Sequence, residues 1–322
     1  MKVCRGNDNF YASYGKCRLL NEQRSRKIFI AVRHSDNRYV AVKLGEISNK
    51  RQTRSTGQRN KREGNNLEHE YAVYRNLRGR GVPHVHWFGI KDGYKAMVMD
   101  LMGPALEELF LYCKRRFSLK TVLMLADQML DRIQCMHDAG YIHGNLTSDT
   151  FVMDIKENIA KVYLVDMKFA SKYIKISGRC RKHIPYEENI EFFGSLCFAS
   201  LNKHLGTVSS RRDDLESCIY IILYFLNFSG SLPWQICGKS NELEQVLEIK
   251  TSISTEVLCH GLPTQFATVL NYCRALKFDD EPNYLFIRQL FRDLFKSLNY
   301  KEDWNFDWVS CYYSERQLNN TF

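Results

Sequence analysis

The chain has 322 residues, of which 44% are hydrophobic, so it can bury a large core in one big domain or in two lobes. Its longest apolar stretch, Cys218 to Leu226, is too short to span a bilayer, and its eleven cysteines lack the paired spacing of a disulfide framework. The formal net charge of +10 is unevenly placed, because residues 1–66 carry 16 Lys and Arg against 5 Asp and Glu.

These properties set expectations about compartment and partners. Unpaired cysteines favour reduced thiols in the cytosol, the nucleus or both, and the lack of an apolar run after Met1 predicts no signal peptide. We expect a monomer that does not bind membranes. The basic N-terminal end favours an acidic partner, nucleic acid or an import receptor, and a solvated basic face is an equally open alternative.

The first part of the chain predicts β-structure after an N-terminal extension, residues 1–15. Residues 16–44 alternate in the manner of strands, with β-rich runs at Lys27 to Arg33 and Arg38 to Leu44. The polar residues 34–37 between these runs predict a turn. A hairpin is therefore expected here.

A basic insert follows, over residues 45–66. It has almost no apolar residues, so it cannot repay its ordering entropy, and we predict a disordered loop that is most basic at 50–62. The pattern then predicts a helix over Leu67 to Leu77 and a buried strand over Ala96 to Asp100. Gly103 and Pro104 are expected to interrupt the chain there.

Helices dominate the predictions for the remainder. Ser118 is expected to cap the N-terminus of one helix, and others are predicted at 213–227, 263–276 and 282–297. The aromatic segment 300–308 is expected to pack back onto them. Strands first and helices later predict an α+β fold with a small sheet-rich lobe joined to a larger helical one.

Two segments resemble the catalytic and metal-binding loops of protein kinases. Residues 141–150, with His143, Gly144 and Asn145, are similar to His-Arg-Asp-x-x-x-x-Asn, and Val165 to Lys168 is similar to Asp-Phe-Gly. Motifs elsewhere resemble the casein kinase 1 family in particular. They lie at residues 103–110, 182–186, 200–202, 210–217, 231–234, 256–259 and 278–280.

The resemblance implies a bilobal protein-kinase fold over residues 16–309. A β-rich N-lobe would span 16–101, including the basic insert, and a helical C-lobe would span 102–309. A short tail, 310–322, would follow. His143 would then be a structural residue, oriented by the Asp213–Asp214 region.

A nucleotide site is also implied. Lys43 matches the lysine that contacts the α- and β-phosphates, and Glu70 matches the helix glutamate that pairs with it. Met99 and Leu101 match positions at the back of the nucleotide pocket and in the hinge, and Asp166 matches the metal-binding aspartate. We therefore expect weak binding of ATP, with poor or no binding of magnesium.

The departures from the family cluster on catalysis. Asn145 replaces the aspartate that acts as the base, and an amide cannot accept a hydroxyl proton. Thr147 replaces the lysine that meets the transferring phosphate, and Thr150 replaces the asparagine that holds the second magnesium. Asp149 is the only carboxylate left in the loop, but the family also has aspartate there and does not use it as the base.

The phosphate contacts depart as well. Residues 16–44 contain no glycine, so side chains such as Arg24 and Arg26 would obstruct the approach of backbone amides to phosphate, or could bind phosphate as cations; we favour obstruction. Lys168 replaces the glycine of the metal loop. It could pair with Asp166 in place of magnesium and make nucleotide binding metal-independent, or it could point into solvent.

The leading interpretation is a casein kinase 1-like pseudokinase that acts by binding, as a scaffold, decoy or allosteric partner, with phosphotransfer absent or very weak. One alternative is a divergent but active Ser/Thr kinase that uses Lys43, Glu70 and Asp166. Another is a nuclear or nucleic-acid-binding adaptor that acts through the basic insert. The sequence does not name the protein partner.

Overall fold

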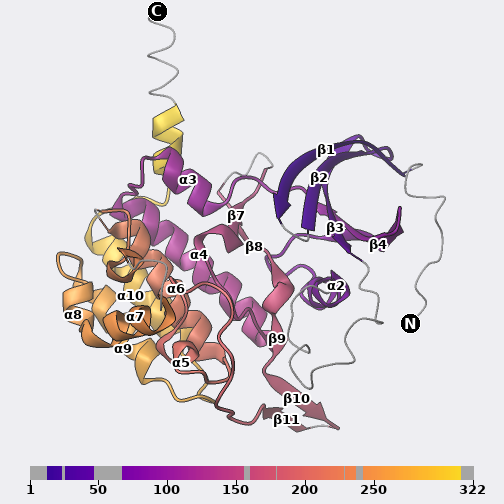
Figure 1. Ribbon diagram of the computed structural model, residues 1–322. Helices are drawn as coiled ribbons and strands as arrows, with labels where there is room; N and C mark the ends of the chain where they lie inside the picture. The colour runs from indigo at the N-terminus through magenta and orange to yellow at the C-terminus, as the bar shows by residue number, and fades with distance from the viewer. Residues whose placement is uncertain are drawn as a thin grey trace, which may run out of the picture. The chain divides into compact units, whose positions relative to one another are not determined.

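The computed structural model is a mixed α+β structure, with strands concentrated in the N-terminal part and helices in the C-terminal part (Figure 1). It describes residues 13–23, 26–46, 67–155, 160–178, 180–227, 229–236 and 242–312. Most of the predicted extension, 1–15, most of the basic insert and most of the tail, 310–322, therefore lie outside the described residues.

The contacts divide the chain into two units. The first contains the described residues up to Gly103 together with Ile155 and the short segment Val165–Phe169, and the second contains the rest. The N-lobe predicted from the sequence, 16–101, does not include Val165–Phe169. This segment carries Asp166, so the first unit includes residues that are distant from its sheet in the sequence.

A curled five-stranded antiparallel sheet forms most of the first unit, in the order β1-β2-β3-β5-β4. The strands are β1 Tyr14–Gln23, β2 Arg26–Arg33, β3 Arg38–Glu46, β4 Val85–Lys91 and β5 Tyr94–Asp100. The predicted hairpin of β2 and β3 is confirmed, with its turn at 34–37. β4 was not predicted.

Alternation along β3 gives the sheet one apolar face. Val40 and Val42 point to the same side and are buried with Ala31 and Val98 of the neighbouring strands. Lys43 is directed to the opposite side because successive side chains alternate across a strand. A basic group can therefore sit on a strand whose other face belongs to the core.

One helix, α2 (Leu67–Asn76), accompanies the sheet. Its buried residues Leu67, Glu70, Val73 and Tyr74 recur at helical spacing and form a single face. Glu70 is the only charged member of that face, so it requires a partner of opposite charge.

The second unit is mainly helical. Its helices are α3 Leu106–Tyr112, α4 Leu119–Asp138, α5 Leu201–His204, α6 Arg211–Leu226, α7 Glu242–Ser252, α8 Thr255–Leu258, α9 Thr264–Ala275 and α10 Tyr284–Ser297. Its short strands are β6 Tyr141–Ile142, β7 Phe151–Met153, β8 Val162–Leu164, β9 Ser171–Lys172, β10 Ile174–Ser177 and β11 Cys180–His183. Three 3-10 turns complete the described elements: η1 Ser148–Thr150, η2 Met167–Phe169, which belongs to the first unit, and η3 Pro233–Ile236.

Side-chain caps set where two of these helices begin. The Ser118 hydroxyl accepts a hydrogen bond from Thr121 N at 3.2 Å, which confirms the predicted cap of α4. α10 begins at Tyr284, two residues later than predicted, because the Asn283 side chain accepts from Phe286 N at 2.9 Å. Within the described ranges, no helix has the length and apolar character needed to cross a membrane.

The segment after α10 docks onto the second unit. Phe306 and Trp308 are buried and stack at 4.5 Å between ring centroids, and Trp308 also lies 5.5 Å from the ring of Phe117. The Asp307 carboxylate accepts hydrogen bonds from the backbone and hydroxyl of Ser118, at 2.6 and 2.8 Å. The expected packing of the aromatic tail is thus confirmed as far as Trp308.

Candidate functional site

The predicted Lys43–Glu70 pair is formed in the first unit. Lys43 lies on β3 and its Nζ donates to Glu70 Oε1 on α2 at 2.6 Å. Both residues are buried, so each charge compensates the desolvation of the other. This is the partner that the polar position on the buried face of α2 requires.

Asp166 supplies a second carboxylate beside the same lysine. Its Oδ1 lies 3.8 Å from Lys43 Nζ, and its backbone N–H donates to the Tyr74 hydroxyl at 3.0 Å. Its φ of 65° is left-handed, a conformation that a non-glycine residue adopts at a cost and that recurs at functional sites. Burial, with Glu70 and Asp166 adding to it, raises the pKa of Tyr74 well above its usual value, so the phenol stays neutral.

Lys168 pairs with Asp166. Its Nζ lies 2.9 Å from Asp166 Oδ2 and 5.0 Å from the centroid of the Phe169 ring. Of the two alternatives left open for this lysine, the structure contains the ion pair. Both oxygens of Asp166 therefore face an ammonium group, Lys43 on one side and Lys168 on the other.

This arrangement does not fit magnesium. The ion requires near-octahedral oxygen donors and is usually held by one or two carboxylates that are free to approach it. Here the carboxylate of Asp166 is already neutralised, and a divalent cation would stand beside the Lys168 ammonium. Across the part of the chain that the structure describes, no group of three or more His, Cys, Asp and Glu is placed to hold a metal ion.

The predicted adenine-side residues lie at the end of β5. Met99 is buried and pairs in register with Ala41 of β3 and Val85 of β4. Leu101 follows the strand and is half-buried. Both positions are thus apolar and at least partly buried, and their contact with a nucleotide stays a prediction.

The predicted catalytic loop lies in the second unit, where Asn145 is used as a structural group. Its Oδ1 accepts a hydrogen bond from the backbone N–H of Ser195 at 2.8 Å. Gly194, with φ of 95°, lets the chain approach so closely that a Cβ there would lie 2.2 Å from the same oxygen. The carboxamide therefore ties the loop to the segment around residue 195.

Thr147 and Thr150 are likewise engaged within the loop. The Thr150 hydroxyl donates to Thr147 O at 2.7 Å and accepts from Thr147 N at 3.1 Å. This reciprocal pair closes the turn η1 and leaves Thr150 buried. Asp149 is exposed beside it, and partial desolvation followed by the carboxylates of Glu107 and Glu108 raises the pKa of its carboxyl.

Asp214 holds the preceding backbone. It is fully buried on α6 and accepts hydrogen bonds from His143 N at 2.7 Å, Gly144 N at 2.9 Å and His137 Nε2 at 3.0 Å. Burial alone would raise the pKa of Asp214, but the hydrogen bonds from His137 and the loop outweigh it and lower the pKa. Asp214 thus holds the backbone of His143 and Gly144, and the structural role of the His143 side chain stays a prediction.

Lys203 is a residue at this loop that the sequence did not reveal. It is 6% exposed, its Nζ donates to Gly144 O, and it lies 4.0 Å from the centroid of the Phe193 ring. Burial lowers the pKa of Lys203 to about 8. No spacing in the sequence relates it to Asn145, because Lys203 reaches the loop only when the chain folds back on Gly144.

A second buried lysine anchors the other end of the same segment. Lys250 of α7 is fully buried and donates to Ala199 O at 2.7 Å and to Leu196 O at 3.1 Å. Its Nζ also lies 4.9 Å from the centroids of the Tyr220 and Trp234 rings. Lys203 and Lys250 together fasten the chain that carries Gly194 and Ser195.

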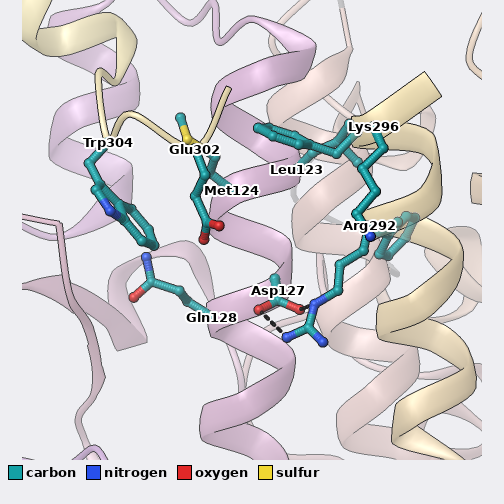
Figure 2. A pocket seen from close by; sticks show the side chains of 10 residues that line it. Leu123, Met124, Asp127, Gln128, Arg292, Lys296, Glu302 and Trp304 are labelled. Carbon is teal, nitrogen blue, oxygen red and sulfur yellow. Dashed lines mark hydrogen bonds and ion pairs between the residues drawn. The ribbon is translucent and has the colours of Figure 1, made fainter. Parts of the chain in front are cut away.

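The second unit also contains a pocket between α4 and α10, with a volume of about 210 Å³. Figure 2 shows the Arg292 guanidinium turned toward Asp127, with the Trp304 ring and the Gln128 amide on the opposite side. Burial raises the pKa of Asp127, but hydrogen bonds from Arg288 and Arg292 outweigh it and lower the pKa. The pocket is smaller than those that bury drug-sized ligands, so we assign it no function.

Two predicted phosphate-contacting features are not tested by these contacts. Arg24 and the basic segment 50–62 lie outside the described residues, and only the backbone of Arg26 is described, opposite Gln23 in the hairpin of β1 and β2. Whether the arginines obstruct or bind phosphate stays a prediction. No protein-family model matches the chain.

Proposed function

We propose that the chain is a casein kinase 1-like pseudokinase with a bilobal protein-kinase fold, which acts by binding and transfers phosphate very weakly or not at all. The observation that carries the proposal is the role of Asn145. Its carboxamide oxygen is committed to Ser195 N at 2.8 Å, and an amide cannot accept a hydroxyl proton. Removing a general base costs on the order of 10²–10⁴ in rate.

The other replacements support the same conclusion. The Thr150 hydroxyl is hydrogen-bonded to the Thr147 backbone, so it is not available as the metal ligand that the resemblance assigns to this position. Thr147 is uncharged and does not supply the phosphate-binding cation assigned to its position. Asp166 is neutralised by Lys168. These changes affect the base, the phosphate contact and the metal independently, and each leaves the surrounding backbone hydrogen-bonded.

A second candidate is a divalent-metal-independent, weak Ser/Thr kinase. Two observations favour it: the Lys43–Glu70 pair is intact at 2.6 Å, and Lys203 places an amine of lowered pKa beside Gly144. Such an amine could supply the positive charge or the base that the loop has lost. The adaptor hypothesis rests on the basic segment 50–62, and no contact of the described residues favours it.

A transfer assay on the purified full chain decides between the first two candidates. We expect no transfer of labelled phosphate to protein or peptide substrates above that of a Lys43→Met variant. Transfer that Lys43→Met abolishes and Lys203→Met reduces would replace the pseudokinase proposal with the weak-kinase one. Transfer that persists unchanged in Lys43→Met would come from a contaminating kinase.

Restoring the missing groups is the complementary experiment. A variant with Asn145→Asp, Thr147→Lys and Thr150→Asn should show transfer where the natural chain shows none, if the frame is that of a kinase. A folded triple variant, judged by an unchanged unfolding midpoint, that binds no nucleotide and transfers nothing would count against the fold assignment itself.

A further inference from the structure

Two cysteines that are far apart in the sequence meet in the second unit. Cys113 follows α3, Cys311 lies in the helical segment 307–312, and their sulfurs are 3.8 Å apart with Cys311 as hydrogen-bond donor. Both thiols are free. A disulfide requires sulfurs about 2.05 Å apart, so an approach of about 1.8 Å would join them.

The contacts around the two cysteines hold their sulfurs close together. The residues that follow Cys113 include Phe117 and Ser118, which bind Trp308 and Asp307 respectively. The same docking therefore fixes both ends of the pair. Packing of the docked segment therefore brings the two sulfurs together.

We propose that Cys113 and Cys311 are a modification site, at which a hydroperoxide forms a reversible disulfide that fastens the C-terminal helical segment to the end of α3. This assignment is independent of whether the chain binds nucleotide or transfers phosphate. It requires only the docked segment and an oxidant.

The burial of the two thiols sets the order of the reaction. Cys311 is half-buried, so its sulfur is the one that reaches the peroxide. Its thiolate attacks one peroxide oxygen, the O–O bond breaks, and a sulfenic acid forms. The leaving hydroxide takes up the proton that the Cys311 thiol released, which gives water. Cys113 then attacks the Cys311 sulfur, the S–S bond forms, the S–O bond breaks, and the proton of Cys113 leaves with the hydroxide as a second water.

Cys113 is protected from direct oxidation. Burial, with Cys311 and Asp307 adding to it, raises the pKa of Cys113 to about 12, so it stays protonated and reacts slowly with peroxide in bulk solvent. It reacts when a sulfenic acid is held next to it. Reduction by a dithiol reverses the link, because two thiols are regenerated.

The test uses the full chain, purified with reductant that is then removed, and hydrogen peroxide as the probe. After alkylation of the remaining thiols, non-reducing peptide mapping should find the Cys113 and Cys311 peptides joined within one chain, with two hydrogen atoms lost. Dithiothreitol should release them. The link should be absent from Cys311→Ser and from Cys113→Ala, and present in Cys180→Ser, which removes an exposed thiol elsewhere.

Hydrogen exchange provides the second measurement. In the oxidised chain, the amides of residues 307–312 should exchange at least roughly tenfold more slowly, because a covalent link prevents the segment from undocking. The proposal would be overturned if Cys311 were oxidised to sulfinic acid while Cys113 remained a free thiol that the alkylating reagent modifies. So would disulfides that join different chains, or a formed link that leaves the exchange of 307–312 unchanged.

Discussion

Replacing Lys168 by methionine should make nucleotide binding depend on magnesium. In the natural chain the Lys168 ammonium lies 2.9 Å from Asp166 and occupies the side of the carboxylate that a cation would use. Methionine is an unbranched side chain one atom shorter than lysine, and it carries no charge. The variant therefore changes the electrostatics of Asp166 while the Lys43–Glu70 pair is retained.

The expected size of the effect follows from Coulomb's law. A divalent ion about 4.5 Å from an ammonium is repelled by about 2 kcal/mol in a water-like dielectric, which weakens magnesium binding roughly twentyfold. The cost to the fold should be small. The side chains of Lys168 and Asp166 are 25% and 28% exposed, and partly exposed ion pairs contribute up to about 1 kcal/mol.

Thermal unfolding with ATP, in magnesium or in EDTA, measures this directly. The natural chain should be stabilised equally in both, by about 2.7 kcal/mol when ATP is 100-fold above its dissociation constant. Lys168→Met should be stabilised more in magnesium than in EDTA. Lys182→Met, which removes an exposed lysine, should behave like the natural chain.

Two results would refute this reasoning. One is stabilisation of the natural chain by ATP only when magnesium is present. The other is a Lys168→Met variant whose response to ATP is the same as that of the natural chain in both buffers. If ATP stabilises neither protein in either buffer, the nucleotide site itself is absent.

Three further predictions concern buried groups of the second unit. Burial lowers the pKa of Lys250 from 10.5 to about 7, so the unfolded chain binds more protons than the folded chain above pH 7. The free energy of unfolding of the natural chain should therefore rise by about 1 kcal/mol between pH 7 and 8 relative to that of Lys250→Met. Urea unfolding at both pH values measures this. Trp308 is buried, so Trp308→Ala should lower the free energy of unfolding by about 3–5 kcal/mol. Tyr312 is exposed, so Tyr312→Ala should lower it by less than about 0.5 kcal/mol. Equal losses would contradict docking of the segment. Asp214→Asn should cost about 3 kcal/mol, because its amide hydrogens would face backbone donors such as Gly144 N, and a neutral result in the same unfolding assay would exclude that role.

The elements with strong local signals could be predicted from the sequence. The alternation of β2 and β3, the Ser118 cap and the apolar spacing of α2 each reflect interactions within a few residues. β4 was missed because its sequence, Val-His-Trp-Phe-Gly-Ile-Lys, mixes polar and apolar residues without a clean alternation. Only its pairing with β5 makes it a strand.

The candidate site divides in the same way. The meeting of Lys43 and Glu70 was expected from the resemblance, and the pairing of Lys168 with Asp166 was one of two open alternatives. Lys203 could not be foreseen, because a lysine acquires that position only when the chain folds back on Gly144. The contact of Cys113 with Cys311 was equally invisible, since 198 residues separate the two cysteines.

The return of Val165–Phe169 to the first unit has a consequence for synthesis on the ribosome. The sheet and α2 are complete by Gly103, yet the hydroxyl of Tyr74 receives its hydrogen bond from Asp166 only after the chain has been made through much of the second unit. In the nascent first unit, Tyr74 and Lys43 therefore lack their contacts with Asp166 until residue 169 has left the exit tunnel. A fragment that ends at Gly103 should accordingly be a client for chaperones and not an autonomous folding unit.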